Sequence, residues 1–495
     1  MPTRLDTLAE VMTTDPVDDA PSTTDGVVML EASTTGGTKT TGARRRESYI
    51  VTHVRQSNAL QRLLSALVLA PAVLVLLVLG PAFSPFLLCS VVVSICSYEF
   101  AWLSHRIVHR IATSVALRDV SGAPRPIPVL NLRHCCTSPI SRGYDKTAAA
   151  ILATVGAGVV VGATYYFQAT HWHYATLPPD PSTHRNDTQA VAYLFVYIGV
   201  STWAAFFCGW LTPSWRSHVL LLTTQALYGL RALAYFGTNY YANRIDIVSL
   251  DYTKQVFALV AMAVHLSQPC AAPADKVRVF FAVVCDCAAY GYVVLLMDPI
   301  STFMVSVVDG RRLALGFLAV VWGADTGAYV TGHVVPALGY RHFHRLAAHI
   351  SPKKDLEGTL GGAFLGVVLI VVVNTLAPPH IRDDQLAGMH MDRESYLAKS
   401  LAWQIVFAVV GAFISRYGDL FASLVKRLAQ VKDTGALIPG HGGMLDRVDA
   451  LLFTAAVFVL YHRISNSTNY DSFIDETYRS WTFQAHVLVT LFPRH

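Results

Sequence analysis

The chain has 495 residues, of which 53% are hydrophobic and only 14% are charged, and its mean hydropathy is +0.41. Soluble domains usually carry about 25% charged residues, so this composition excludes an ordinary soluble protein and predicts a multi-spanning membrane protein. The net charge of +5 is too small to indicate a nucleic-acid partner, and it favours anionic partners such as lipid head groups or nucleotides.

The beginning of the chain is polar. Residues 1–57 are rich in Thr, Asp, Ser and Gly, and we expect them to form a disordered tail. Basic residues precede the first apolar run, so the positive-inside rule assigns this tail to the cytosol. We expect N-terminal transmembrane helices over 58–312, a C-terminal transmembrane region with the charged motifs over 313–465, and a C-terminal tail over 466–495.

The apolar runs predict an all-α membrane fold. A membrane-spanning helix needs about 20 apolar residues. Candidate spans lie at 62–80, 83–104, 147–167, 190–212, 217–236, 254–270, 277–298, 313–335, 359–377, 400–422 and 448–464. Arg231 interrupts one of them and polar residues after 264 interrupt another, so we expect about nine to eleven spanning helices.

The loops indicate an orientation. Eleven spans counted from a cytosolic N-terminus place the loops 336–358 and 423–447 on the cytosolic side. The glycosylation sequons that begin at Asn186 and Asn466 then fall on the far side.

Some suggestive residues have simple explanations. The eight cysteines form no CxxC pair and lack zinc spacing, so we expect buried free thiols. His105 and His109 have the i, i+4 spacing of many zinc ligands, but no HExxH glutamate lies between them, and a basic membrane flank explains them better. For the isolated Asp286 we favour an interhelical hydrogen bond or a water-filled kink.

A charged stretch near the end, LVKRLAQVKDTGALIPGHGGMLDRVD at 424–449, interrupts the apolar pattern. Asp419, Ser423 and Lys426 are spaced i, i+4 and i+7, so they share one helix face, and Arg427 flanks it. Such a face combines a carboxylate with cations that can contact phosphate oxygens.

The second half of this stretch adds further charges. Asp446 and Asp449 are at i and i+3, so their carboxylates converge, while Arg447 between them can equally pair with an aspartate. Mg²⁺ prefers a few carboxylates together with substrate phosphates, which these acids can supply.

A glycine-rich loop joins the two halves. After Lys432 and Asp433 comes the sequence PGHGG, in which Gly440, Gly442 and Gly443 surround His441. Glycines allow backbone N–H groups to point into one concavity, which suits a polyphosphate, and the histidine can orient a phosphate.

Two upstream segments are also charged. Asp325 lies in WGADTGAYVTG, and Lys353, Lys354 and Glu357 lie in HISPKKDLEGTLGG. The lysines can bind phosphates or can simply form a positive-inside flank. Glu357 can occupy the first turn of a helix, and Asp325 can form an interhelical hydrogen bond.

These motifs carry a family resemblance. The stretch Ser423–Asp449, with its K-R-x4-K-D-x-G-x2-I-P-G-H-G-G-x2-D-R-x-D pattern, resembles the signature of phosphatidate cytidylyltransferases, also called CDP-diacylglycerol synthases. ISPKKDLEGTLGG and ADTGAYVTG resemble two other segments of that family. Asp355 and Leu356 depart from it, since threonine and an aromatic residue are common there.

The resemblance implies a reaction, a cofactor and a location. CTP and phosphatidic acid would give CDP-diacylglycerol and pyrophosphate in a membrane enzyme, often a homodimer. In eukaryotes such an enzyme lies in the endoplasmic reticulum membrane. Mg²⁺ would be held by Asp419 and Asp446, with Asp433 and Asp449 as further ligands or their partners, and a second cation stays open. Lys426, Arg427 and Lys432 would contact phosphates, and Asp325, Lys353, Lys354 and Glu357 would complete the substrate site.

Other classes of protein remain alternatives. A lipid kinase of the dolichol or phytol kinase type also uses CTP in a membrane, but it releases CDP instead of pyrophosphate. A transporter would line its path with intramembrane charges, but it has no need of this glycine-rich, Lys/Asp-dense loop. The spaced-aspartate motif of CDP-alcohol phosphotransferases is absent from the sequence.

Overall fold

The computed structural model describes most of the membrane region. The described residues are 71, 73–76, 84–120, 135–141, 143–171, 187–240, 252–270, 273–306, 310–340, 342–352, 354–377, 392–435 and 442–466. The two predicted tails, apart from Asn466, and most of the predicted span at 62–80 lie outside them. The predicted division into regions therefore stays a prediction.

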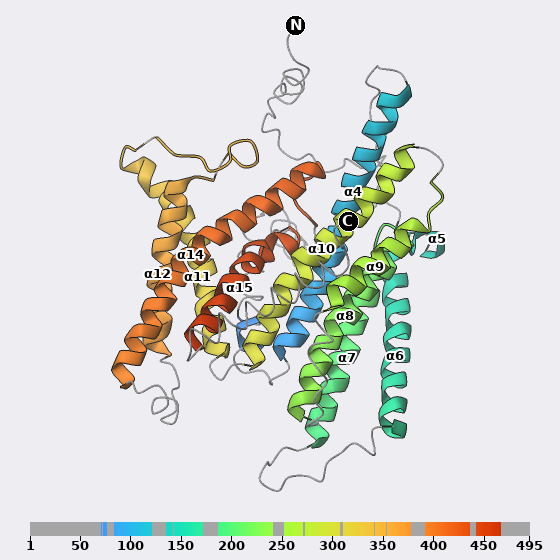
Figure 1. The fold of residues 1–495 in the computed structure, drawn as a ribbon, viewed down its shortest axis with the longest axis horizontal. Helices are drawn as coiled ribbons and strands as arrows, with labels where there is room; N and C mark the ends of the chain where they lie inside the picture. Colours follow the sequence, from blue (N-terminus) through green and yellow to red (C-terminus); the bar gives the residue numbers. More distant parts are fainter. Residues whose placement is uncertain are drawn as a thin grey trace, which may run out of the picture. The chain divides into compact units, whose positions relative to one another are not determined.

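The described residues fold into helices and form no β-strand, which confirms the all-α expectation (Figure 1). The helices are α4 (Ser84–Val120), α5 (Ser138–Ser141), α6 (Asp145–His171), α7 (Asp187–Trp210), α8 (Trp215–Tyr240), α9 (Thr253–Leu266), α10 (Pro273–Ser306), α11 (Gly310–Ala337), α12 (Leu356–Leu376), α14 (Arg393–Leu428) and α15 (Leu445–Asn466).

Seven described helices are long and apolar enough to cross a membrane, namely α4, α6, α7, α10, α11, α12 and α14. The three other predicted spans within the described residues fall on α8, α9 and α15, which are not among these seven. Helix α9 has only 14 residues, fewer than the roughly 20 that a bilayer requires.

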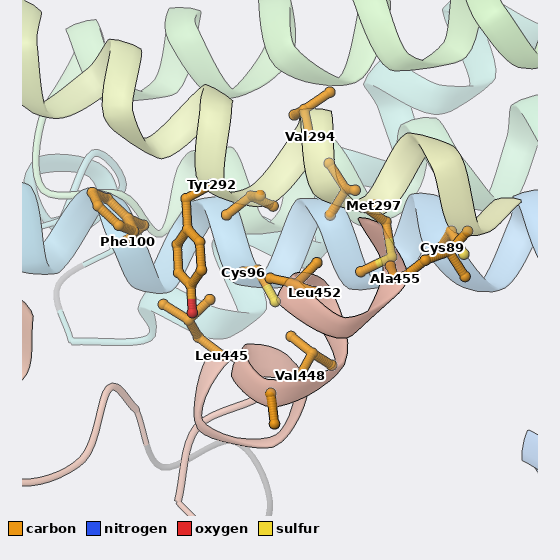
Figure 2. Close-up of a cluster of buried hydrophobic side chains, with 14 of the residues drawn as sticks. Cys89, Cys96, Phe100, Tyr292, Val294, Met297, Leu445, Val448, Leu452 and Ala455 are labelled. Carbon is orange, nitrogen blue, oxygen red and sulfur yellow. The ribbon is translucent and has the colours of Figure 1, made fainter. Parts of the chain in front are cut away.

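The largest buried cluster joins the first described helix to the last one. Figure 2 shows side chains of α4, α10 and α15 meeting in this cluster, among them Phe100, Cys96, Tyr292, Met297, Leu445 and Val448. Residues far apart in sequence thus enclose the start of α15. This packing fixes the position of the charged stretch that precedes the helix.

Polar residues within the helices find partners across helix interfaces. Asp286 accepts a hydrogen bond from Ser104 at 3.3 Å, and its other oxygen lies 2.6 Å from His265 Nε2. The predicted interhelical role of Asp286 is therefore confirmed. Arg231, which interrupts a predicted span, forms an ion pair with Asp298 of α10. All eight cysteines are free, as expected, but only three of them are buried and the other five are half-buried, so the expected burial is wrong for those five.

Glycines bring α11 and α12 into close contact. A Cβ atom added at Gly327 would lie 2.8 Å from the Cα atom of Gly362, a separation that real Cβ atoms essentially never show. In Figure 1 the two helices lie beside α14, against which α12 also packs. Because Asp325 lies on α11 and Lys354 directly precedes α12, this contact sets the spacing of two predicted site residues.

We expect Gly327→Ala to destabilise the folded protein by about 1–3 kcal/mol, because the methyl group forces α11 and α12 apart. Gly332→Ala on the same helix is the matched control, since its added methyl group would meet no atom within 4 Å. Thermal unfolding in detergent, followed by gel filtration, measures both. Equal melting temperatures for the two variants would contradict the close packing.

Candidate active site

The charged stretch folds as a turn between two helices. Helix α14 ends at Leu428, and Gln430 adopts a left-handed backbone with φ of 55°. Such a residue is common just after a helix C-terminus, although glycine is the usual choice. The Val431 N–H donates to the carbonyl oxygen of Lys426, which closes the helix end. Helix α15 begins at Leu445, and its Asp446 lies 2.7 Å from Lys426 of α14, so charged side chains of the two helices meet.

Asp446 is the centre of this turn. Its Oδ1 lies 2.7 Å from Lys426 Nζ, and its Oδ2 accepts hydrogen bonds from the backbone N–H groups of Thr434 and Gly443 at 2.9 and 3.2 Å. The side chain is 8% exposed. Two parts of the predicted signature, 20 residues apart, are thus held together by one carboxylate.

The backbone N–H groups of the described turn are already bonded to carboxylates of the chain. Gly443 donates to Asp446, whereas Met444 and Leu445 donate to Glu99. A phosphate could reach these three N–H groups only by displacing a carboxylate. Of the other predicted cradle residues, Gly442 adopts a left-handed backbone with φ of 81° and is not one of these three donors, while Gly440 and His441 lie outside the described residues.

Glu99 of α4 is a site residue that sequence reasoning missed. It is 1% exposed, and its carboxylate contacts the start of α15 from a helix more than 300 residues earlier in the chain. The sequence does contain a signal for Glu99, because burying an ionisable residue inside an apolar run such as 83–104 costs free energy, and such a residue is usually functional.

A second ion pair lies beside the first one. Lys354 Nζ is 2.6 Å from Asp419 Oδ2, and Arg416 is 3.7 Å from the same oxygen. The charges of Lys354, Arg416 and Arg447 also act on Asp325. The structure thus places Asp325 of α11 near Lys354, the lysine of the predicted segment before α12.

Asp449 lies between the two pairs. It is 4% exposed, and the charges of Asp419, Lys426 and Lys354 all act on it. Tyr292 of α10 is also close, and its hydroxyl group is buried without a hydrogen-bond partner within the described part of the chain. A buried hydroxyl without a partner is unusual, and sequence reasoning did not single it out.

Glu357 has partners of its own. It accepts a hydrogen bond from the His344 backbone N–H at 3.0 Å, and its Oε1 lies 2.6 Å from the Nδ1 of the same residue. Tyr340 donates to it as well. In the described structure Glu357 therefore fixes the loop before α12, and its predicted contact with a substrate stays a prediction.

Asp355, which departs from the family pattern, caps α12. Its side chain accepts a hydrogen bond from the Gly358 N–H at 2.7 Å. Because aspartate and threonine are both good N-cap residues, the departure preserves the local structure.

The remaining predicted site residues differ in exposure. Arg427, Lys432 and Asp433 are exposed, and neither cation has a hydrogen-bond or ion-pair partner among the described side chains. Ser423 is half-buried one turn before Lys426. Lys353 lies outside the described residues. The exposed cations are therefore free to meet an anion that enters from the loop side.

The carboxylates of the site can supply some of the ligands that a divalent cation needs. Within the described residues no group of three or more His, Cys, Asp or Glu side chains could hold a metal ion by itself. Mg²⁺ needs only one or two carboxylates when substrate phosphates and water complete its shell. Asp419, Asp446 and Asp449 supply carboxylates at neighbouring positions, so the arrangement suits a metal that arrives together with a phosphate ligand.

The fold and the site together define a polytopic α-helical membrane protein with a Lys–Asp cluster where its C-terminal helices meet. The model of the cytidylyltransferase family matches residues 217–465, which contain most of this cluster. The chain belongs to the cytidylyltransferase family.

Several relatives are similar to part of the chain. A phosphatidate cytidylyltransferase of Thermotoga maritima is 37% identical over 155 residues, which cover 31% of this chain and 50% of that protein. One of Haemophilus influenzae is 40% identical over 148 residues, or 30% of this chain and 44% of that protein. Phosphatidate cytidylyltransferase 5, chloroplastic, of Arabidopsis thaliana is 40% identical over 121 residues, or 23% and 24%. The chain spans about half the length of the two bacterial relatives.

Proposed function

We propose that the chain is a phosphatidate cytidylyltransferase, which converts CTP and phosphatidic acid into CDP-diacylglycerol and pyrophosphate. The observation that carries this proposal is the convergence of Asp419, Lys354, Lys426, Asp446 and Asp449 from three separate segments into one charged cluster. The names of the relatives supply the substrate class.

The chemistry requires charge neutralisation more than proton transfer. An oxygen of the lipid phosphate attacks the α-phosphorus of CTP, and the bond to the β-phosphate oxygen breaks, so that pyrophosphate leaves. The second pKa of a phosphate monoester is about 6, so the attacking group is already mostly a dianion at neutral pH. No general base is needed. The obstacle is the repulsion between two anions, which cations at the site reduce.

The residues divide this task. Exposed Arg427 and Lys432 attract the triphosphate from the loop side, while Lys426 and Lys354 hold the aspartates in place and add positive charge beside the reacting phosphates. Bound Mg²⁺ would neutralise charge on the triphosphate and on the leaving pyrophosphate. Asp419, Asp446 and Asp449 are the residues that would hold it.

The surroundings of the site follow from the same proposal. The lipid tails stay in the bilayer, and the head group enters sideways between the helices. We place the site on the cytosolic face, in the endoplasmic reticulum, on the positive-inside pattern and the family resemblance. The proposal that the protein forms a homodimer rests only on the family resemblance.

A labelling experiment tests the reaction. The purified protein is incubated with Mg²⁺, phosphatidic acid and CTP labelled at either the α- or the γ-phosphate. The proposal expects label in the chloroform phase from α-labelled CTP alone, and loss of this product when a chelator is added. Chloroform-soluble label from the γ position, with a polyprenol as acceptor, would show a lipid kinase instead. No labelled lipid from either nucleotide in a folded sample would overturn both.

A further inference from the structure

Glu99 lies outside the segment that defines the family. It belongs to α4, whereas the family match begins at residue 217. We propose that Glu99 is a positioning residue of the active site, which holds the turn and the first residues of α15 so that Asp446 and Lys426 are presented correctly. This inference rests on the proposed function, and its experiment includes a measurement that does not need activity.

The carboxylate occupies the N-terminus of α15. Glu99 Oε1 accepts from the Met444 N–H at 2.9 Å, and Oε2 accepts from the Leu445 N–H at 2.8 Å. The first N–H groups of a helix have no partner within the helix, and the helix dipole favours a negative charge there. In the described structure Glu99 forms no ion pair with a lysine or arginine. Its hydrogen bonds all go to the turn and to α15.

A hydroxyl group links Glu99 to the centre of the site. Thr434 Oγ1 lies 2.9 Å from Glu99 Oε2 and 3.0 Å from Asp446 Oδ2. Asp446 in turn holds Lys426. A continuous polar chain therefore runs from α4 through the turn to Asp446, a predicted metal ligand, and Lys426, a predicted catalytic residue.

The glycines of the signature make room for this carboxylate. A Cβ atom added at Gly435 would lie 2.6 Å from Glu99 Oε1, and one added at Gly443 would lie 2.6 Å from Oε2. A larger residue at Gly435 would displace Glu99, whereas one at Gly443 would first meet the Thr434 hydroxyl group. The glycines at these two positions are thus explained by side chains of the chain itself.

The test compares Glu99→Gln with Asp298→Asn. Both replace a buried carboxylate by an amide of the same shape, but Asp298 forms an ion pair with Arg231 of α8. For Glu99→Gln we expect kcat to fall about 10- to 100-fold, with the KM for phosphatidic acid within about threefold of wild type. Asp298→Asn is expected to keep its kcat per folded molecule. An unchanged kcat in folded Glu99→Gln would overturn the proposal.

Amide hydrogen exchange supplies the measurement that is independent of activity. Exchange at Met444 and Leu445, followed by mass spectrometry in nanodiscs, should become at least about tenfold faster in Glu99→Gln and stay unchanged in Asp298→Asn. If the wild type lacks cytidylyltransferase activity while exchange responds in this way, the proposed function fails and the placement of the turn by Glu99 stands. Unchanged exchange would overturn the placement.

A second variant covers the case in which Glu99→Gln does not fold. Thr434→Val removes only the hydroxyl link between Glu99 and Asp446 and keeps the side-chain shape. We expect a fall in kcat of about 3- to 30-fold without a change in the KM for phosphatidic acid. Full activity in this variant would overturn the polar chain as the route by which Glu99 positions Asp446.

Discussion

We expect Asp446→Asn to lower kcat/KM for CTP by about 10²- to 10³-fold while the protein still folds and inserts. One oxygen of Asp446 faces the Lys426 ammonium group, and the other accepts hydrogen bonds from the Thr434 and Gly443 N–H groups. An asparagine amide has only one acceptor oxygen, so its NH₂ group must face a donor on one side. The substitution also removes a negative charge that would hold a cation.

Asp392→Asn is the matched control for this prediction. Asp392 is exposed and caps α14 by accepting a hydrogen bond from the Ser395 N–H at 3.1 Å, and asparagine is an equally good N-cap. We therefore expect activity within about twofold of wild type in the control. Initial rates in detergent micelles, with gel filtration as the folding check, measure both variants. Near wild-type turnover in Asp446→Asn would contradict the central role of this carboxylate.

Much of the fold could be predicted because membrane helices are defined by local composition. The apolar runs predict all the helices in the described residues except the short α5, and the interhelical contact expected for the isolated Asp286 is present. Helix α9 shows the limit of this reasoning. Polar residues after 264 already weaken this predicted span, and the structure shows that the helix ends at Leu266, after 14 residues.

The site was predictable where its residues are neighbours in sequence. Helical spacing placed Asp419 and Lys426 on one face, but it could not show that each pairs with a residue from another segment. Glu99 meets the turn from 335 residues away in the chain, and no periodicity encodes such a contact. Tyr292 was equally hidden, because a tyrosine in an apolar helix is normally part of the core.

The structure gives the signature glycines a different role from the predicted phosphate cradle, again because a residue that contacts them is distant in sequence. A glycine-rich loop beside lysines resembles a phosphate cradle, because both need close approach to the backbone. In the structure the group that approaches Gly435 is the Glu99 side chain, whereas Gly443 is approached first by the Thr434 hydroxyl group and then by Glu99. The sequence shows that space is required there, whereas only the packing of α4 against α15 shows what fills it (Figure 2).

The second large effect is expected at the other ion pair. Lys354→Met should lower kcat/KM by about 10- to 100-fold, because it removes the cation that separates three aspartates. Lys354 pairs with Asp419, and its charge also acts on Asp325 and Asp449. Burial lowers the pKa of Lys354, and the Asp419 carboxylate opposes part of this shift. Without the lysine, the three carboxylates repel one another.

The double variant Lys354→Met/Asp419→Asn separates stability from catalysis. The single lysine variant leaves a partly buried carboxylate without its partner, which costs about 1–2 kcal/mol at this exposure, and removing the carboxylate's charge should recover most of that loss. Activity should not recover, because Asp419 is a proposed metal ligand. Melting temperature and kcat/KM are measured for both variants and for Lys399→Met, an exposed lysine at the opposite end of α14. Recovery of turnover in the double variant would show that the pair only supports the fold, and the site would then have to function through Asp446 and Asp449 alone.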